Sequence, residues 1–169
     1  DFELTAAHDR SVEPGQTSQL TYSVKNTGVS VDSYSISVSD VRGWVSSVSP
    51  TTTTPTAMPG ATRYVSVYVS VPATALLTES EIVTFTLTSS NDNQISRTVT
   101  TTVVTSESYN VSVEMDADTK DLTPGQPFPL QVNITNEGNA DTVFLLSGGI
   151  SSNPINWDLS FSSTYTGTL

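Results

Sequence analysis

The sequence contains no cysteine, and this absence removes several kinds of chemistry at once. Disulfide bonds, zinc–thiolate centres and cysteine nucleophiles all need that residue. Histidine occurs once, at His8, and the chain has no Gly-x-Ser-x-Gly motif, so a hydrolytic triad would lack both its nucleophile turn and a positioned base. We therefore predict that the protein is not an enzyme and that His8 is exposed and inert.

Basic residues are also scarce, with 6 Lys and Arg against 17 Asp and Glu, which gives a formal net charge of −11. Nucleic acids and anionic membranes both attract basic surfaces, so neither is expected as a partner. No apolar run approaches the roughly 18 residues of a membrane-spanning helix, so membrane insertion of this segment is not expected either. The acids are densest in residues 105–169, with 8 acids and 1 base, and this part is the better candidate for binding a cation.

Hydroxyl side chains are abundant instead: 26 Ser and 27 Thr fill 53 of the 169 positions. They alternate with apolar residues at a period of two, which predicts half-buried strands. Turn residues such as Pro-Gly and Asn-x-Gly separate these short strands, an arrangement typical of an antiparallel sandwich rather than a βαβ fold. The predicted strands include residues 20–24, 34–38, 65–71, 82–87 and 95–104.

The segment from Ala73 to Glu81 is the one candidate for a helix, but it is short and contains two Thr and one Ser, so we interpret it as a loop. Glu79 and Glu81 within it could form a glycosidase pair. The segment offers no aromatic cleft in which a sugar ring would be distorted, however. We predict that both carboxylates are solvated.

Two stretches of the chain repeat each other 110 positions apart. Leu20 to Gly28 reads LTYSVKNTG, and Leu130 to Gly138 reads LQVNITNEG, each after a Pro-Gly-Gln. A repeat on this scale predicts two units in tandem. Further matching positions are Asp32 with Asp141, and Gly43-Trp44 with Asn156-Trp157.

The order of these motifs resembles that of known Ig-like modules. Pro-Gly-Gln, a strand ending in Asn-x-Gly, a Trp, and Pro-Gly before a strand closing in Val71-Pro72 are similar to CARDB-type and alpha-galactosidase-associated modules of bacterial and archaeal surface proteins. The resemblance covers Phe2 to Val104 fully and Tyr109 to Leu169 in part. It implies tandem Ig-like antiparallel β-sandwiches with a spacer or adhesion role outside the membrane and no activity of their own.

The second copy of the repeat is incomplete. It has counterparts of the strands as far as Trp157 to Phe161, but nothing corresponds to Pro59-Gly60 and the strands that follow. A sandwich without these strands would expose its core and an unpaired edge. Either a longer chain has been cut, or a neighbouring subunit supplies strands, for which Phe2 to Ala6 is a suitable donor.

The acidic run MDADTKD, Met115 to Asp121, is a candidate calcium site. Asp116, Asp118 and Asp121 provide hard oxygen ligands at close spacing, although the glycine and the bidentate glutamate of an EF-hand are absent. The other interpretation is a solvated acidic surface. Asp141 would be an added ligand if the fold brings it near.

Two sequons occur, at Asn110-Val111-Ser112 and Asn133-Ile134-Thr135. Each Asn falls on the polar phase of a predicted strand and should face outward. Attachment of glycans to a surface protein needs such a position, so Asn110 and Asn133 are predicted glycosylation sites.

The aromatic residues fit a core better than a binding surface. Trp44 and Trp157 recur at equivalent places in the repeat, so we predict a core role for both. Tyr68 lies on the serine phase of its strand and should face outward. We count it as the one exposed ring, which is too little for a carbohydrate platform.

Together these patterns predict two Ig-like β-sandwich units, 1–104 and 107–169, joined by a short linker at Thr105 to Ser108, with the second unit partial. The predicted function is a non-catalytic, extracellular structural module of a cell-surface layer, stalk or filament, whose partners are copies of itself or other surface proteins. The alternative is an adhesin or a carbohydrate-associated binding module, which an exposed aromatic cluster would favour. No cofactor other than calcium is expected.

Overall fold

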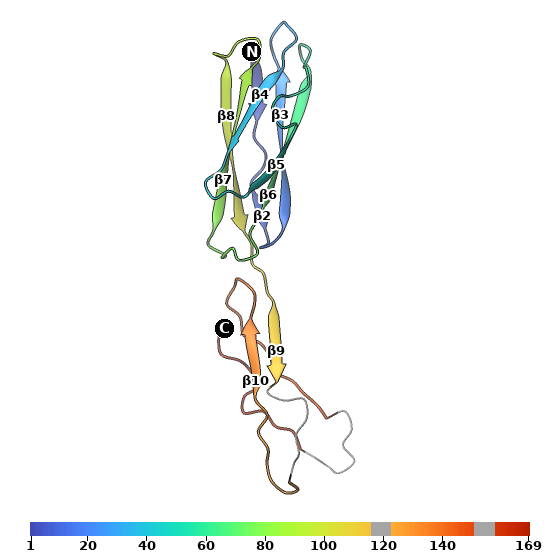
Figure 1. Ribbon diagram of the computed structural model, residues 1–169, viewed down its shortest axis with the longest axis vertical. Coiled ribbons are helices and arrows are strands. Elements are labelled where there is room, and N and C mark those ends of the chain that lie inside the picture. The colour runs from blue at the N-terminus through green and yellow to red at the C-terminus, as the bar shows by residue number, and fades with distance from the viewer. Residues whose placement is uncertain (116–122, 151–157) are drawn as a thin grey trace. The chain divides into compact units, whose positions relative to one another are not determined.

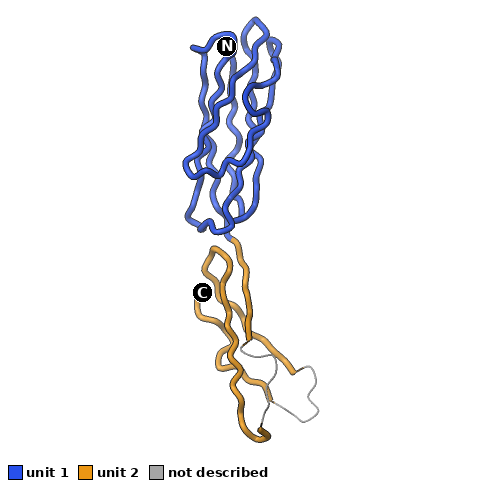
Figure 2. Tube along the Cα trace, in the orientation of Figure 1, with its two compact units in different colours: residues 1–107 blue, residues 108–169 orange. Residues whose placement is uncertain are grey.

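The computed structural model describes residues 1–115, 123–150 and 158–169, and the chain forms two compact units, Asp1–Glu107 and Ser108–Leu169 (Figure 2). All ten regular elements of the described residues are β-strands (Figure 1), which confirms the predicted all-β class. No helix that could span a membrane occurs among these residues. The strands are β1 (Phe2–Thr5), β2 (Arg10–Val12), β3 (Thr17–Asn26), β4 (Tyr34–Ser39), β5 (Val45–Ser49), β6 (Thr62–Ser70), β7 (Ser80–Ser89), β8 (Ser96–Thr105), β9 (Val111–Met115) and β10 (Val132–Asn136).

The first unit is a sandwich of two four-stranded sheets, with the strand orders β1-β3-β6-β5 and β2-β8-β7-β4 (Figure 1). Strands β2 and β8 pair in parallel, and the other pairs in these sheets are antiparallel. Each sheet has one apolar face, so the two sheets stack and bury those faces against each other. The predicted Ig-like antiparallel β-sandwich is confirmed in this unit.

The core of the first unit follows the period-two pattern of the sequence. The ring of Tyr22 stacks on that of Phe85 with centroids 4.2 Å apart, and Phe2 packs against Tyr34 with centroids 4.6 Å apart. Burying one large apolar side chain contributes about 1.5–3 kcal/mol, so the alternation itself stabilises the sandwich. Other inward side chains of the strands are Leu20, Val24, Val65, Val67, Val69, Val83, Leu87 and Val103.

Five strands lie where the alternation predicts them, and the segment 73–79 forms turns rather than a helix, as predicted. Strand β5 does not show the period-two alternation of apolar and polar residues. Its register against β6 shifts between Val45 and Ser47, and such a bulge interrupts the alternation. Strand β2 has three residues, too few to show a period. It forms through its pairing with β8.

In the second unit, β9 and β10 pair antiparallel over their full lengths. Val113 lies opposite Ile134, and Ser112 lies opposite Thr135, so one face of this sheet is apolar and the other is polar. Val113 is 61% exposed, which shows that the apolar face is uncovered in the described part of the unit. The interpretation of this unit as a partial sandwich stays a prediction.

Candidate functional site

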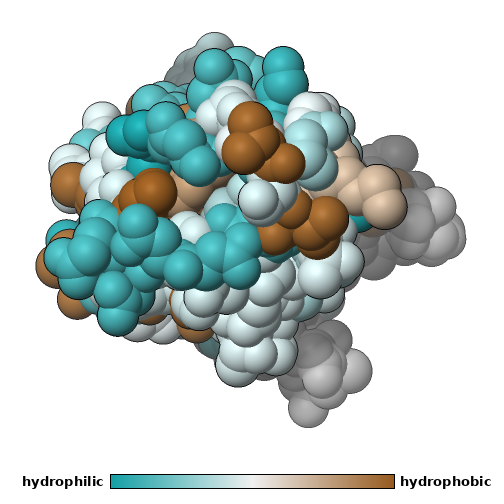
Figure 3. Space-filling view, turned by 90° about the horizontal axis from the view of Figure 1, so that it is seen from above, coloured by the Kyte–Doolittle hydropathy of each residue, from teal (hydrophilic) through white to brown (hydrophobic). Residues whose placement is uncertain are grey.

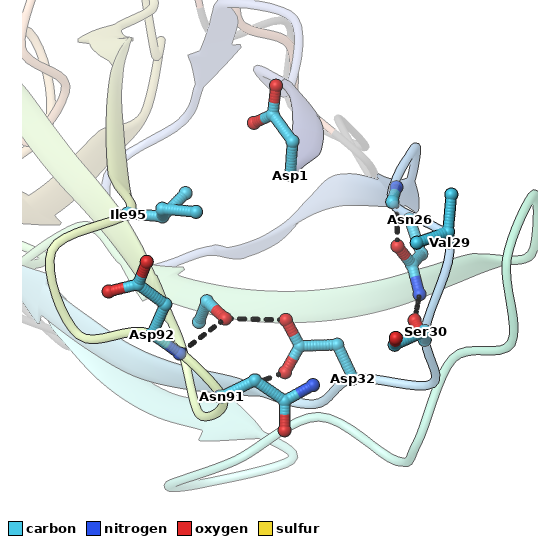
Figure 4. Close-up of a pocket in the computed structure, with 10 residues that line it drawn as sticks. Asp1, Asn26, Val29, Ser30, Asp32, Asn91, Asp92 and Ile95 are labelled. Atoms are coloured by element: carbon cyan, nitrogen blue, oxygen red, sulfur yellow. Dashed lines mark hydrogen bonds between the residues drawn. The ribbon is translucent and has the colours of Figure 1, made fainter.

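A shallow cavity of about 180 Å³ lies where the β3–β4 and β7–β8 loops of the first unit come together (Figure 4). Acidic and amide side chains make up half of its lining, and such groups could bind a cation or act in acid–base chemistry. The lining residues include Asp1, Asn26, Asp32, Asn91, Asp92 and Ile95.

Asp32, at the floor of this cavity, is 7% exposed, and both of its carboxylate oxygens are engaged. Oδ2 accepts a hydrogen bond from Ser89 Oγ at 2.5 Å, and Oδ1 accepts from the backbone N–H groups of Ser33 at 2.8 Å and Asn91 at 3.3 Å (Figure 4). These bonds tie the β7–β8 loop to the β3–β4 loop. A carboxylate occupied in this way positions loops and has no free oxygen with which to act as a general base.

The exposed apolar side chains near this cavity are scattered. Figure 3 views this end of the molecule and shows apolar areas interrupted by hydrophilic ones. Val29, Val31 and Met58 are among the exposed residues of the loops here. Single exposed apolar residues are normal on soluble proteins, so this end does not form a continuous hydrophobic docking surface.

His8 is exposed in the loop between β1 and β2, as predicted. In the ranges 1–115, 123–150 and 158–169, no group of three or more His, Asp or Glu residues is arranged to hold a metal ion. The described residues thus bring together neither a metal cluster nor an acid–base pair around this histidine.

The prediction that Glu81 is solvated is wrong. Glu81 is 0% exposed because it lies on β7, in the inward phase that continues with Val83. Its Oε1 accepts from the backbone N–H groups of Val41 and Ile82, both at 2.8 Å, and its Oε2 accepts from that of Arg42 at 2.7 Å. Three such donors satisfy a buried carboxylate, so Glu81 fixes the β4–β5 loop.

Glu79, the second carboxylate of the glycosidase pair considered from the sequence, is less buried than Glu81 and pairs with a charged side chain. Its Oε1 forms a 2.9 Å ion pair with Nη1 of Arg42, whose Nε also donates to the carbonyl of Ser80. Both carboxylates therefore bind Arg42 of the β4–β5 loop, Glu81 through the backbone N–H and Glu79 through the guanidinium group. Neither faces an aromatic cleft lined by described residues, so the arrangement does not resemble a glycosidase centre.

The predicted calcium ligands Asp116, Asp118 and Asp121 lie outside the described residues, so the site stays a prediction. Trp157, the predicted core residue at the equivalent place in the second unit, also lies outside them. Asp141 is described and exposed. Trp44 itself is 5% exposed, in agreement with its predicted core role.

Both predicted glycosylation sites are exposed. Asn133 lies on β10 opposite Glu114, on the polar face of the two-stranded sheet. Asn110 immediately precedes β9 instead of lying within it, and its Nδ2 donates to Glu137 Oε2 at 3.2 Å. Alternation along β9 puts Asn110 in the same phase as Ser112, so both sequons belong to the polar face.

Asn26, at the end of β3, closes a turn with its side chain. Nδ2 donates to the carbonyls of Ser30 and Ala57, each at 2.8 Å, and Oδ1 accepts from Gly28 N–H at 2.9 Å. A Cβ on Gly28 would come within 3.0 Å of the nitrogen of Asp1, so the close approach of β1 favours glycine there. The Asn-x-Gly motif thus forms a turn whose asparagine side chain also hydrogen-bonds to a segment distant in the sequence, at Ala57.

Asn136 repeats this arrangement at the end of β10. Nδ2 donates to the carbonyls of Ala140 at 2.9 Å and Leu169 at 2.8 Å, and Oδ1 accepts from Gly138 N–H at 2.9 Å. A Cβ on Gly138 would overlap the carbonyl oxygen of Ser108, on the segment that leads into β9. The second turn therefore has the same side-chain hydrogen bonds as the first. Its glycine is also favoured for the same reason, the close approach of a neighbouring segment.

Backbone pairs after the two turns also correspond. Asp32 and Ala57 exchange N–H···O bonds of 3.0 and 2.7 Å, and Thr142 and Leu169 exchange bonds of 3.2 and 3.0 Å. Thr142, not Asp141, therefore occupies the place of Asp32, and the predicted match of the two aspartates is wrong by one position. The two turns are equally long, from Asn26 to Asp32 and from Asn136 to Thr142, so the 110-position offset of the repeat itself gives Thr142 as the counterpart of Asp32.

The next pair along the same segments is equivalent as well. Tyr34 N–H donates to Thr54 Oγ1 at 3.0 Å, and Thr54 N–H donates to the Tyr34 carbonyl at 2.9 Å. Phe144 N–H donates to Thr166 Oγ1 at 2.9 Å, and Thr166 N–H donates to the Phe144 carbonyl at 3.0 Å. The described second unit thus reproduces the part of the first that contains β1, β3 and the start of β4.

The two units differ beyond this shared frame. Strand β3 lies between β1 and β6, whereas β10, its counterpart, pairs with β9 and has no second neighbouring strand in the described residues. One edge of β10 is consequently open. Many apolar side chains of this unit are also exposed, among them Val113, Met115, Leu130, Val132, Leu145, Leu159 and Phe161.

The expectation of a single outward ring is wrong. Tyr68 faces outward on β6 as predicted, but Tyr64 shares its phase and is 64% exposed. The alternation with the buried Val65 and Val67 that places Tyr68 on the outer face places Tyr64 there as well. Two tyrosines therefore stand on one surface.

Residues 12–90 match the sequence model of a known family, the NPCBM-associated, NEW3 domain of alpha-galactosidase. The resemblance to alpha-galactosidase-associated modules is confirmed over these residues. The NEW3 match runs from the end of β2 to the residue after β7, so it includes the Asn-x-Gly turn, Asp32 and Trp44. No curated protein matches the chain.

Several solved structures are similar to this chain at low identity. The ASH/PapD-like domain 7 of human CEP192 is 13% identical, with a TM-score of 0.45, over 62% of this chain and 82% of that one. A chaperone–tip adhesin complex of CFA/I fimbriae is 10% identical, with a TM-score of 0.44, over 90% and 76%. The class 5 fimbriae chaperone CfaA is 12% identical, with a TM-score of 0.42, over 90% and 77%. Likeness at this level concerns the fold alone.

Proposed function

We propose that the chain is a non-catalytic, extracellular structural module of a cell-surface layer, stalk or filament. The observation that carries this proposal is the hydrogen-bond frame shared by the two units, centred on Asn26 and Asn136. Repetition of one structural unit along a chain is typical of repeat architectures, and a spacer can be built from such units.

The use of the buried polar groups supports the non-catalytic part of the proposal. Asp32 and Glu81 are the buried carboxylates of the described residues, and each is satisfied by donors of neighbouring loops. A catalytic acid or base needs a proton partner and a place for substrate, and neither carboxylate has an oxygen left for these. The NEW3 match agrees, because it concerns a domain associated with alpha-galactosidase.

The polar face of β9 and β10 supports the extracellular part. Both sequons, at Asn110 and Asn133, belong to this exposed face, where glycans would not disturb packing. The net charge of −11 favours a well-solvated surface. We include glycans at these two residues in the proposal.

The open edge of β10 supplies the contact through which such modules would join. Among the described residues, its backbone groups on this edge, the exposed Val132 and the half-buried Ile134 would be covered by a strand in the place that β6 takes beside β3. A neighbouring subunit or a later segment of the same polypeptide would supply this strand. The expected donor from Phe2 to Ala6 is unsuitable, since Phe2 is 1% exposed and β1 already pairs with β3.

The location is tested on cells that produce the protein, with antibodies raised against residues 1–107. Labelling of intact cells, lost after protease treatment of the cell surface, is expected. Labelling that requires permeabilised cells would contradict the proposal. Mass spectrometry of the native protein then shows whether Asn110 and Asn133 carry glycans.

The joining contact is tested by sedimentation of residues 1–169 at increasing concentration, with residues 1–107, a complete sandwich, as the reference. Association that Ile134→Asp removes and Thr135→Asp leaves intact would indicate a neighbouring subunit, because these residues lie on opposite faces of β10. A monomer whose second unit is unfolded would instead indicate a later segment. A monomer with a folded second unit would contradict strand completion altogether.

A further inference from the structure

Two tyrosines stand on the outer face of the sheet formed by β1, β3, β6 and β5. Tyr64 is 64% exposed, and Tyr68 is partly exposed. Both extend from β6 four residues apart, so their rings share one face and their Cα atoms lie about 13 Å apart. We define the tyrosine face as the outward side chains of β3 and β6 around them: Thr17, Gln19, Thr21, Ser23, Tyr64, Ser66, Tyr68 and Ser70.

The sheet beneath the tyrosine face holds it in place. Strand β6 is an inner strand, hydrogen-bonded to β3 on one side and to β5 on the other. Ser66, between the two rings, accepts a hydrogen bond from Gln19 Nε2 at 2.8 Å, and Gln19 lies opposite Tyr68 in the register. Polar groups are thus fixed between and beside the rings, which lowers the entropy lost when a ligand is bound.

This combination of groups matches the chemistry of a sugar chain. A tyrosine ring has an apolar face and a polar hydroxyl, and a pyranose ring likewise has an apolar C–H face and hydroxyls at its rim. The separation of about 13 Å between the two Cα atoms exceeds the length of one pyranose, so a ligand that contacts both residues would be an oligosaccharide. Tyr64 and Tyr68 stand on a face of the sheet and do not line the cavity described above, so the ligand would lie along an open surface.

Charge narrows the class of sugar further. The tyrosine face as defined contains hydroxyl, amide and phenol groups, and the two ionised outward residues beside it on the same sheet, Lys25 and its register partner Glu3, have opposite charges. The chain as a whole carries −11, which disfavours an anionic polymer. We propose that the tyrosine face binds an extended, neutral polysaccharide, in addition to the structural role of the module.

The other sheet of the same unit provides an internal control. The outer face of β4, β7 and β8 carries rows of hydroxyls, with Thr86 Oγ1 and Thr98 Oγ1 hydrogen-bonded at 2.8 Å. It resembles the tyrosine face in hydroxyl content but has no aromatic ring among its outward strand residues. The outward residues include Ser35, Ser37, Ser39, Thr84, Thr86, Thr88, Ser96, Thr98, Thr100 and Thr102, with the apolar Ile82 and Val104 at one end.

The test is affinity electrophoresis of the intact chain in gels that contain galactomannan, xyloglucan or mixed-linkage β-glucan, with polygalacturonate as the anionic comparison. At least one neutral polymer should retard the chain, and polygalacturonate should not. Tyr64→Ala and Tyr68→Ala should each weaken binding about tenfold, and the double variant should remove it. The Thr86→Ala/Thr98→Ala variant on the opposite sheet should bind like the unchanged chain.

Folding is controlled with Tyr64→Phe/Tyr68→Phe, which keeps both rings and should retain most of the binding. Circular dichroism melts of each variant show whether the sandwich is intact. Absence of retardation in all three neutral gels would overturn the proposal. So would binding that survives the double alanine variant, or binding that the threonine variant reduces as strongly.

Discussion

Asn136 forms in the second unit the same three hydrogen bonds that Asn26 forms in the first. In each case the amide bonds to the residue four positions later and to a carbonyl more than 30 positions later. The side chain therefore connects a local turn with a distant segment. An asparagine is suited to this role because one side chain carries two donors and an acceptor.

The Asn26→Ala variant should destabilise the first unit by about 1–3 kcal/mol, because the buried carbonyl of Ala57 loses its side-chain donor and the turn loses an acceptor. Urea unfolding of residues 1–107 measures this change. Asn93→Ala, an exposed asparagine in the β7–β8 loop, should change stability by less than about 0.5 kcal/mol. Equal effects of the two variants would contradict the role assigned to Asn26.

The Glu81→Gln variant should lower the free energy of unfolding by about 1.5–3 kcal/mol, since hydrogen bonds to a charged acceptor are stronger than those to an amide. The new NH2 group would also face the N–H donors of Val41 or Arg42. Glu3→Gln, exposed on β1, is the matched control and should be close to neutral. A neutral Glu81→Gln would indicate that the loop is fixed by other contacts.

The two buried tyrosines should respond differently to loss of their hydroxyls. Tyr22 OH donates to Thr101 Oγ1 at 3.0 Å, so Tyr22→Phe should cost about 0.5–1.5 kcal/mol. Tyr34 OH is buried without a hydrogen-bond partner in the described structure, so Tyr34→Phe should be neutral or stabilising. Thermal unfolding of both variants in parallel gives the order. The reverse order would show that Tyr34 OH has an acceptor.

Stability should fall at alkaline pH. Burial raises the pKa of Tyr22 and of Tyr34 above the ordinary value of about 10. The unfolded chain then loses these protons at a lower pH than the folded one. The stabilisation is complete below about pH 10 and is lost as the pH rises through the folded-state values.

Urea midpoints between pH 8 and 11 measure this effect. The decline should be shallower in the Tyr22→Phe/Tyr34→Phe variant, which has neither titrating group. Tyr64→Phe, which changes an exposed tyrosine, should keep the decline of the unchanged chain. Identical declines in all three proteins would mean that other groups cause the alkaline loss.

Strand alternation made the core of the first unit predictable. The placement of Val65, Val67 and Val69 inside and of Ser66 and Tyr68 outside follows from a period of two and needs no tertiary information. The bulge in β5 and the three-residue β2 could not be predicted, because they depend on pairing with strands distant in the sequence. The candidate calcium and glycan residues remain predictions.

The sequence by itself determined which residues alternate, where the Asn-x-Gly turns fall and that the frame of the first unit recurs after 110 positions, because these features are encoded within a few neighbouring residues. Only the tertiary structure decided that a carboxylate is satisfied at the buried position 81, since two of its three donors, the N–H groups of Val41 and Arg42, are some 40 positions away in the chain. It also left one edge of β10 without a neighbouring strand among the described residues. Which donors satisfy a buried polar group, and which strand edge stays unpaired, depend on segments that meet in space, so local pattern does not contain this information.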